Sequence, residues 1–255
     1  MPGATDVCVI WPCGLPFDKM RADPATSRGI LETLIPYCEE KARAFEGLIK
    51  LSGSDTHLHR IAAAGLFRVP RCLRAVLLLA DSSLSLEAST ISRTLVELAI
   101  VACWIGDDEE RGSLVWNRFV VDQHRGLMRL DEFYKFMKPS TKEERERLKA
   151  IPGRPGIGAC AMQSVDVGDF PAQRVALFLH EVLYDSLSAG AHGDLRHAVS
   201  VVQWGGEDEL VDEALMAAIS ASVSLLCVTS LQLGFRPDIE KFLAASNIQS
   251  PFAAV

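Results

Sequence analysis

The feature that most constrains this chain is an uncharged stretch from Ala214 to Phe235, with the sequence ALMAAISASVSLLCVTSLQLGF. As a helix it is long enough to cross a bilayer, which takes about 20 apolar residues. It nevertheless contains four serines, a threonine and a glutamine, and acidic residues, DELVDE, precede it. A helix that is apolar on all sides belongs either in a membrane or in a protein core. The polar content and the acidic flank favour the core, so we predict a buried central helix.

The rest of the composition favours a helical fold around that helix. Hydrophobic residues make up 49% of the 255 residues but aromatic residues only 7%, and no Asn-Gly or Asp-Gly hairpin signal occurs. Leu and Ala are strong helix formers. We therefore predict an all-α fold, a bundle of about six to eight helices, with no strands.

The domain boundaries follow from glycine and proline. Residues 1–25 are predicted to form an irregular arm, and 26–255 a single helical domain in which 152–170 is a glycine-rich loop or lid. Pro36 and Pro70 fall inside helical patterns and are expected to kink or break them, because proline lacks the N–H that the helix needs. Gly106 is expected to end one helix, and the acidic run 107–110 to begin the next.

Charge and cysteine content narrow the function classes. The net charge of −7 disfavours nucleic acid as a partner, since phosphate binding usually needs a basic surface. The seven cysteines are scattered without a C-x-x-C pair, which is typical of a reducing compartment. The first residues lack the pattern of a signal peptide. The expected location is therefore cytoplasmic, without membrane insertion. The six histidines show no recurring metal-ligand spacing, so no metal and no cofactor is expected.

Two polar patterns predict a cluster between helices. Arg93 and Glu97 are the only charges between Ala88 and Ile105, and they lie among apolar neighbours. Charged side chains are rarely buried unless they are paired, and Arg before Glu is the weaker order for a pair within one helix. Both should therefore reach another helix. The polar residues Tyr184, Ser188 and His192 recur at every fourth position and are the best match. Such a cluster is either a network that fixes how the helices pack or a ligand site.

These motifs also carry a resemblance. The segment RTLVELAIVACWIGDDEERGSLVWNRFVVDQHR resembles that of a bacterial all-helical family known as domain of unknown function 5677. The shared motifs are R-x-x-x-E (Arg93, Glu97), a D-x-E-E-R type helix start (108–111) and Y-x-x-x-S-x-x-x-H (Tyr184, Ser188, His192). The resemblance covers roughly residues 55–200. It implies a helical bundle with a shared polar cluster, and no established activity.

Two functions remain open. The first is a binding module for a small molecule or a protein partner, with a homodimer as one option. The second is a metal-independent ribonuclease, because Arg174-VALFL-His180 is similar to the Arg–His pair of helical toxin and defence proteins of the HEPN superfamily. There His would act as a general base and Arg would stabilise the charged transition state. Val175 departs from that pattern, and an ideal α-helix would set Arg174 and His180 about 120° apart.

Overall fold

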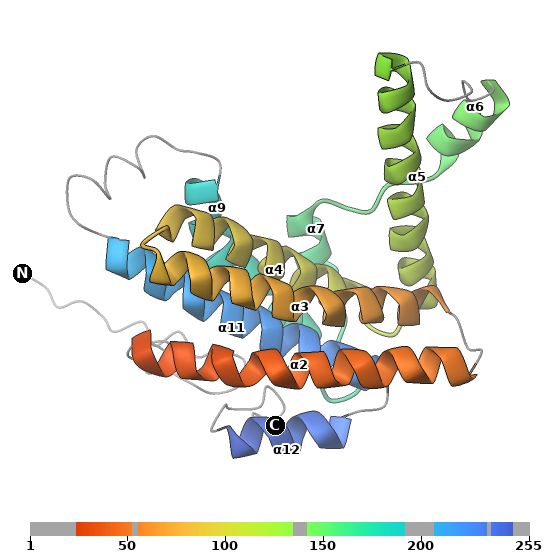
Figure 1. Cartoon of the computed structure of the whole chain (residues 1–255). Coiled ribbons are helices and arrows are strands. Elements are labelled where there is room, and N and C mark those ends of the chain that lie inside the picture. The colour runs from red at the N-terminus through yellow and green to blue at the C-terminus, as the bar shows by residue number, and fades with distance from the viewer. Residues whose placement is uncertain (1–23, 53–55, 135–141, 192–206, 234–235, 247–255) are drawn as a thin grey trace, which may run out of the picture.

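The described part of the protein is all α-helical, as predicted (Figure 1). This computed structural model describes residues 24–52, 56–134, 142–191, 207–233 and 236–246. The predicted arm at 1–25 lies outside these residues, except for Pro24 and Ala25, which begin a helix. In the described residues the only β-type pairing is one isolated bridge between Val167 and Phe170.

Four long helices form the body of the bundle. They are α2 (Pro24–Ser52), α3 (His57–Asp81), α4 (Ser85–Ile105) and α11 (Glu207–Gln232). Helix α11 packs against α2, α3 and most extensively α4. Every residue from 214 to 230 except Met216 is buried, so the prediction of a buried central helix is confirmed.

Two hydroxyl groups of α11 are satisfied by the backbone of the helix itself, whereas the buried Ser222 Oγ has no partner among the described residues. Ser224 Oγ donates to the carbonyl of Ser220 at 2.7 Å, and Thr229 Oγ1 donates to that of Leu225 at 2.7 Å. From α4, Ser92 Oγ donates to the Ala214 carbonyl at 2.8 Å and ties the two helices together. Both α4 and α11 are long and apolar enough to cross a membrane, but 61% and 89% of their spans are buried within the bundle. Core helices of soluble proteins have these same properties.

The expected helix breaks at Pro36 and Pro70 do not occur. Helix α2 runs through Pro36 and α3 runs through Pro70. A proline costs one backbone hydrogen bond and crowds the preceding turn. Burial outweighs that cost in α3, where Pro70 lies between the fully buried Val69 and Leu73 and contributes to the packed face.

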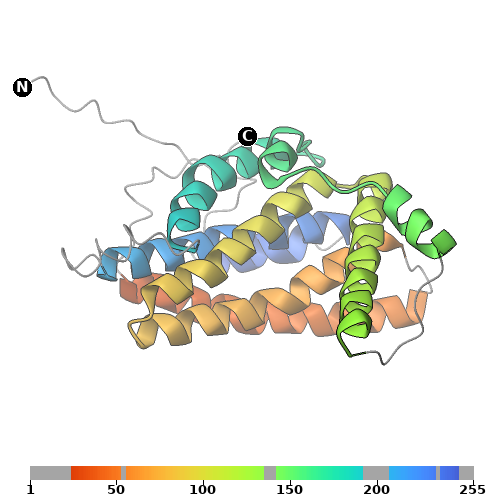
Figure 2. The ribbon, with the colours of Figure 1, turned by 90° about the horizontal axis from the view of Figure 1, so that it is seen from above.

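The remaining helices surround this body. They are α5 (Glu109–Tyr134), α6 (Lys142–Ala150), α7 (Ile157–Met162), α8 (Ala172–Phe178), the π-helical segment η1 (Leu179–Tyr184), α9 (Asp185–Ala191) and α12 (Arg236–Ala245). Helix α5 contacts α3 and α4 and then leaves the bundle at a steep angle (Figure 1). Seen from above, α4 lies between α3 on one side and the continuous segment α8–η1–α9 on the other (Figure 2).

The segment 152–170 is more ordered than a loop. It contains the short helix α7, which packs against α4 and α8. Cys160 and Ala161 are fully buried there, and so is Phe170 at the end of the segment. The sequence prediction missed α7 because its six residues are too few to show a helical period.

Candidate functional site

Arg93 of α4 and Tyr184 of η1 form the centre of a polar cluster. Arg93 Nη2 donates a 2.8 Å hydrogen bond to Tyr184 Oη, and its guanidinium carbon lies 4.9 Å from the centre of the Tyr184 ring. Arg93 Nη2 also lies 3.3 Å from Glu97 Oε1, one turn further along α4. The structure thus brings together three of the five residues expected to meet, and Arg93 reaches a second helix as predicted.

The cluster is only partly buried. The side chain of Arg93 is 17% exposed and that of Glu97 is 34% exposed. Glu97 therefore keeps part of its hydration, while most of Arg93 is removed from water. The pair lies at the edge of the core rather than inside it.

Two buried atoms, one in this cluster and one on the neighbouring helix α9, have hydrogen-bonding capacity that no other described residue uses. Arg93 Nε and Ser188 Oγ are both buried and lack a partner in the described part of the chain. Leaving a buried polar group unsatisfied costs about 1–3 kcal/mol. Nε–H is a donor only, whereas the hydroxyl can donate or accept. An acceptor group placed beside the guanidinium would recover the cost at Arg93.

Ser188 lies on α9, which packs against α4, so the predicted hydroxyl does face the bundle. His192, the fifth member of the predicted cluster, lies outside the described residues. An ideal α-helix drawn from Arg174 at about 100° per residue puts Ser188 on the same side as Asp185 and Arg174. Those two are exposed, but the Ser188 oxygen is buried.

The π-helical segment explains this difference. In a π-helix the hydrogen bonds run between residues i and i+5 instead of i and i+4, so each turn is wider and each residue turns the helix by less than 100°. A wheel drawn at 100° per residue is therefore wrong across Leu179–Tyr184. Such segments occur frequently at functional sites. Here it contains His180 and Tyr184, two of the candidate residues.

His180 lies beside the cluster. Its ring is stacked on that of Tyr184, with centres 5.6 Å apart and an angle of 15° between the planes. On its other side is Gly158 of α7, where a Cβ atom would come within 3.1 Å of His180 Nε2. Glycine at 158 is thus what allows the segment 152–170 to approach the histidine. This segment lies next to the polar cluster, as a lid would.

Arg174, the proposed partner of His180 in a ribonuclease, lies exposed on α8. His180 is half-buried, and the contacts described for it are with Tyr184 and Gly158. The ribonuclease interpretation stays a prediction.

The acidic run at 107–110 begins a helix, as predicted, and it also joins two helices. Asp108 Oδ1 accepts hydrogen bonds from the backbone N–H groups of Glu110 and Arg111 at the start of α5. Glu109 accepts from the backbone N–H of His57 at 3.0 Å and of Leu58 at 3.4 Å, and so caps α3 rather than its own helix. This second role was not visible in the sequence, because it depends on the distant start of α3.

Arg111 completes this junction. Its Nη1 donates to the carbonyls of Trp104 and Gln163, at 2.6 and 3.1 Å, and its guanidinium lies 5.2 Å from the centre of the Trp104 ring. The D-x-E-E-R type helix start thus holds the ends of α3, α4 and α7 together. These contacts give the motif a structural role.

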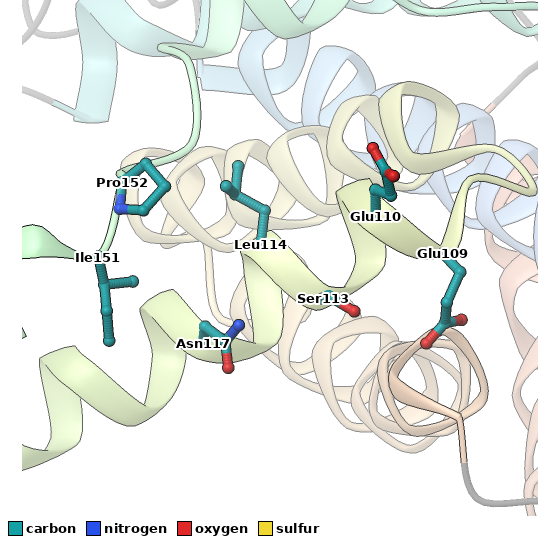
Figure 3. A pocket seen from close by; sticks show the side chains of 7 residues that line it. All are labelled: Glu109, Glu110, Ser113, Leu114, Asn117, Ile151 and Pro152. Atoms are coloured by element: carbon teal, nitrogen blue, oxygen red, sulfur yellow. The ribbon is translucent and has the colours of Figure 1, made fainter.

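A shallow pocket of about 300 Å³ lies next to this junction. In Figure 3, Glu109, Glu110, Ser113, Leu114 and Asn117 of α5 line one side, and Ile151 and Pro152 line the other. Glu109 is already used as a cap, which leaves Glu110 as the carboxylate without a described partner. Among the described residues no group of three or more His, Cys, Asp or Glu side chains could hold a metal ion.

The sequence model of a family of unknown function, DUF5677, matches residues 59–209. The chain belongs to this family. Arg93, Glu97, Tyr184 and Ser188 all lie within the matched range, as do α4 to α9. Helix α2, α12 and most of α11 lie outside the DUF5677 match, although α11 forms the centre of the core. No match was found among curated proteins or among solved structures.

Proposed function

We propose that this DUF5677 protein is a helical binding module, and that the cluster of Arg93, Glu97, Tyr184 and Ser188 recognises an acceptor-bearing small molecule. The observation that carries the proposal is the buried Nε–H of Arg93, which no described residue accepts. Ligand sites in helical bundles lie between facing helices and combine an apolar setting with a few convergent polar groups.

The two buried atoms without a partner, Arg93 Nε and Ser188 Oγ, indicate the class of ligand. A guanidinium can bind a carboxylate or a phosphate through two parallel hydrogen bonds, and one such edge includes Nε. In Arg93 the Nη2 group already contacts Tyr184 and Glu97. A planar carboxylate or an amide carbonyl beside Nε, with Ser188 Oγ as a second contact, satisfies both open atoms.

The position of the segment 152–170 supports the same proposal. Had it been far from the cluster, a purely structural network would be the better explanation. Instead Gly158 lies against His180, and His180 stacks on Tyr184. The closeness of α7 to the cluster therefore supports a ligand site over a purely structural network.

Native mass spectrometry of the full chain, purified without added ligands, tests the proposal first. We expect wild type to retain a small molecule and Arg93→Ala to lose it. Arg93→Lys keeps the charge but not the planar donor edge, and should also lose most of it. Arg118→Ala is the matched control, because Arg118 forms only an i,i+4 pair with Asp122 on the surface of α5.

If no mass is retained, a panel of carboxylates and phosphates is screened by thermal unfolding. A ligand at 100 times its Kd stabilises by about 2.7 kcal/mol. The absence of any shift that depends on Arg93 would contradict the proposal. In that case, RNA cleavage lost in both Arg174→Ala and His180→Ala would favour the ribonuclease instead.

A further inference from the structure

A separate cavity of about 310 Å³ lies on the opposite side of α4, between α3, α4, α5 and α11. Its walls are formed mainly by large apolar side chains: Ile61, Leu98, Val101, Trp116, Phe119 and Leu225. It shares no residue with the polar cluster. Arg93 bonds to Tyr184 of η1, whereas this cavity is lined by residues of α3, α5 and α11. Figure 2 shows α3 and η1 on opposite sides of α4.

Two polar side chains of α11 that reach the cavity are engaged in hydrogen bonds to the backbone. The Thr229 hydroxyl donates to the Leu225 carbonyl, and Gln232 Nε2 donates to the Gly106 carbonyl. The Trp116 ring is held by Arg60, whose guanidinium carbon lies 5.1 Å from the ring centre, and by Phe119, with ring centres 5.8 Å apart. The interior therefore suits an apolar group, and half of the Phe119 surface remains exposed at the edge.

The region next to the cavity is positively charged. A hollow of about 520 Å³ adjoins the cavity and shares Ala64 and Arg68 with it. Arg68 and Arg71, one turn apart on α3, both line this hollow and are both exposed. No carboxylate in the described residues forms an ion pair with either, whereas the nearby Arg74 pairs with Glu39. Arg68 also forms a hydrogen bond with the Cys72 thiol; burial nevertheless raises the pKa of that thiol, so Cys72 adds no negative charge.

We propose that this groove binds a single-chain amphiphile with an anionic head, the alkyl chain in the apolar cavity and the head beside Arg68 and Arg71. Two arginines without a carboxylate partner among the described residues, at the mouth of an apolar cavity, stand out in a chain whose net charge is −7. An alkyl chain gains from each methylene removed from water, and the head gains from two arginines that form no ion pair with a carboxylate of the described residues. A neutral or cationic amphiphile lacks the second contribution.

The test is calorimetric titration of the full chain with dodecanoate below its micelle concentration. Octanoate is compared with dodecanoate for chain length, and dodecyltrimethylammonium for head charge. We expect dodecanoate to bind at least tenfold more tightly than octanoate. The cationic amphiphile should bind at least tenfold more weakly, and dodecyl phosphate tests whether the head site accepts phosphate as well as carboxylate.

Two variants link this binding to the groove. Ala64→Trp fills the shared wall from an exposed position, so it should leave the fold intact and abolish binding. Arg68→Glu combined with Arg71→Glu should weaken dodecanoate binding at least tenfold. Arg147→Glu on α6 carries the same type of charge change at an exposed position far along the chain, and should bind as wild type does.

The proposal is wrong if dodecanoate fails to bind, or if Ala64→Trp binds it as well as wild type, which indicates non-specific adsorption. It is also wrong if Ala64→Trp instead changes the oligomeric state in size-exclusion chromatography, since the groove is then an interface between copies. None of these results depends on Arg93, so this proposal and the proposed function can fail separately.

Discussion

Arg93 combines three interactions in one side chain: a hydrogen bond to Tyr184, stacking on the same ring, and an ion pair with Glu97. When one partner of a fully buried pair is removed, the cost is about 3–5 kcal/mol, because a charge is left in the core. Glu97 is 34% exposed and keeps part of its hydration. The cost of losing Arg93 is therefore smaller than for a fully buried pair.

We expect Arg93→Ala to lower the free energy of unfolding by about 1–2 kcal/mol. Tyr184→Phe removes only the hydroxyl, so the double variant should show a coupling energy of about 1 kcal/mol between the two positions. Urea unfolding of the single and double variants measures both quantities. Arg118→Ala serves as the control, because the Arg118 side chain pairs with Asp122 within the single helix α5. A loss below about 0.5 kcal/mol for Arg93→Ala, as expected for an exposed residue, would contradict a partly buried cluster.

At the level of helices, the ends are held by side chains from other parts of the chain. Asp108 caps α5, while the adjacent Glu109 caps α3 across a gap of about fifty residues, and Arg111 links the end of α4 to the residue after α7. Each cap satisfies backbone N–H groups that the helix itself leaves open. The same principle applies at the other side of the bundle, where α12 is attached to α2 through side chains.

Asp108→Ala and Glu109→Ala should each lower the free energy of unfolding by about 1 kcal/mol, the usual value of a cap. The two residues cap different helices but are adjacent in the chain, so the double variant measures how strongly the two caps are coupled. Asp107→Ala is the matched control, since Asp107 is exposed and adjacent. Chemical denaturation gives the three values. If Glu109→Ala behaves like Asp107→Ala, the contact between α5 and α3 contributes nothing to stability.

Helix α12 is attached to α2 by an ion pair and a stacked aromatic pair. Lys41 Nζ lies 3.0 Å from Asp238 Oδ2, and the rings of Tyr37 and Phe242 are 3.8 Å apart. The hydrogen bond and charge of Lys41 hold the pKa of the Asp238 carboxyl below its usual value. A carboxyl group with a lowered pKa in the folded state stabilises the fold above its unfolded pKa, and this contribution is lost as the pH falls through the folded pKa.

We therefore expect Asp238→Asn to be less stable than wild type at neutral pH, and the difference to shrink as the pH falls below about 4. Urea unfolding of both proteins over this pH range measures the difference. Lys41→Met should show the same loss at neutral pH, because it removes the other partner. A difference between wild type and Asp238→Asn that stays constant with pH would show that the ion pair does not stabilise α12.

For the whole molecule, α11 is the element on which the others pack. Leu215 and Leu226 are almost completely buried, and α2, α3, α4 and α12 all contact α11. The other helices bury α11, as expected for the central helix of a protein core. The cytoplasmic location predicted from the sequence stays a prediction.

Leu226→Ala should lower the free energy of unfolding by about 2–5 kcal/mol, since it leaves a cavity in the core. Leu78→Ala is the control, because Leu78 is 68% exposed, and it should change stability by less than about 0.5 kcal/mol. Both are measured by denaturation in water without detergent. A chain that needs detergent to stay in solution, and in which Leu226→Ala is neutral, would contradict the role of α11 as a protein core.

The sequence by itself determined the helical class, the buried central helix, the helix end at Gly106 and the helix start at 107–110. Each of these depends on local patterns: the length of an uncharged run, a glycine at a helix end, and acids in a first turn. The pair Arg93–Glu97 could also be predicted, because two charges among apolar residues need partners. A feature can be predicted from the sequence when the residues that cause it lie within one or two helical turns of each other.

Tertiary structure decided the rest. Pro70 remains within α3 because its burial offsets the lost hydrogen bond, and the π-helical turn at 179–184 rotates Ser188 into the bundle, which no local signal reveals. The capping of α3 by Glu109, the approach of Gly158 to His180, and the cavity between α3, α4, α5 and α11 all join residues far apart in the chain. Such contacts depend on how helices pack. They were therefore determined only when the whole bundle formed.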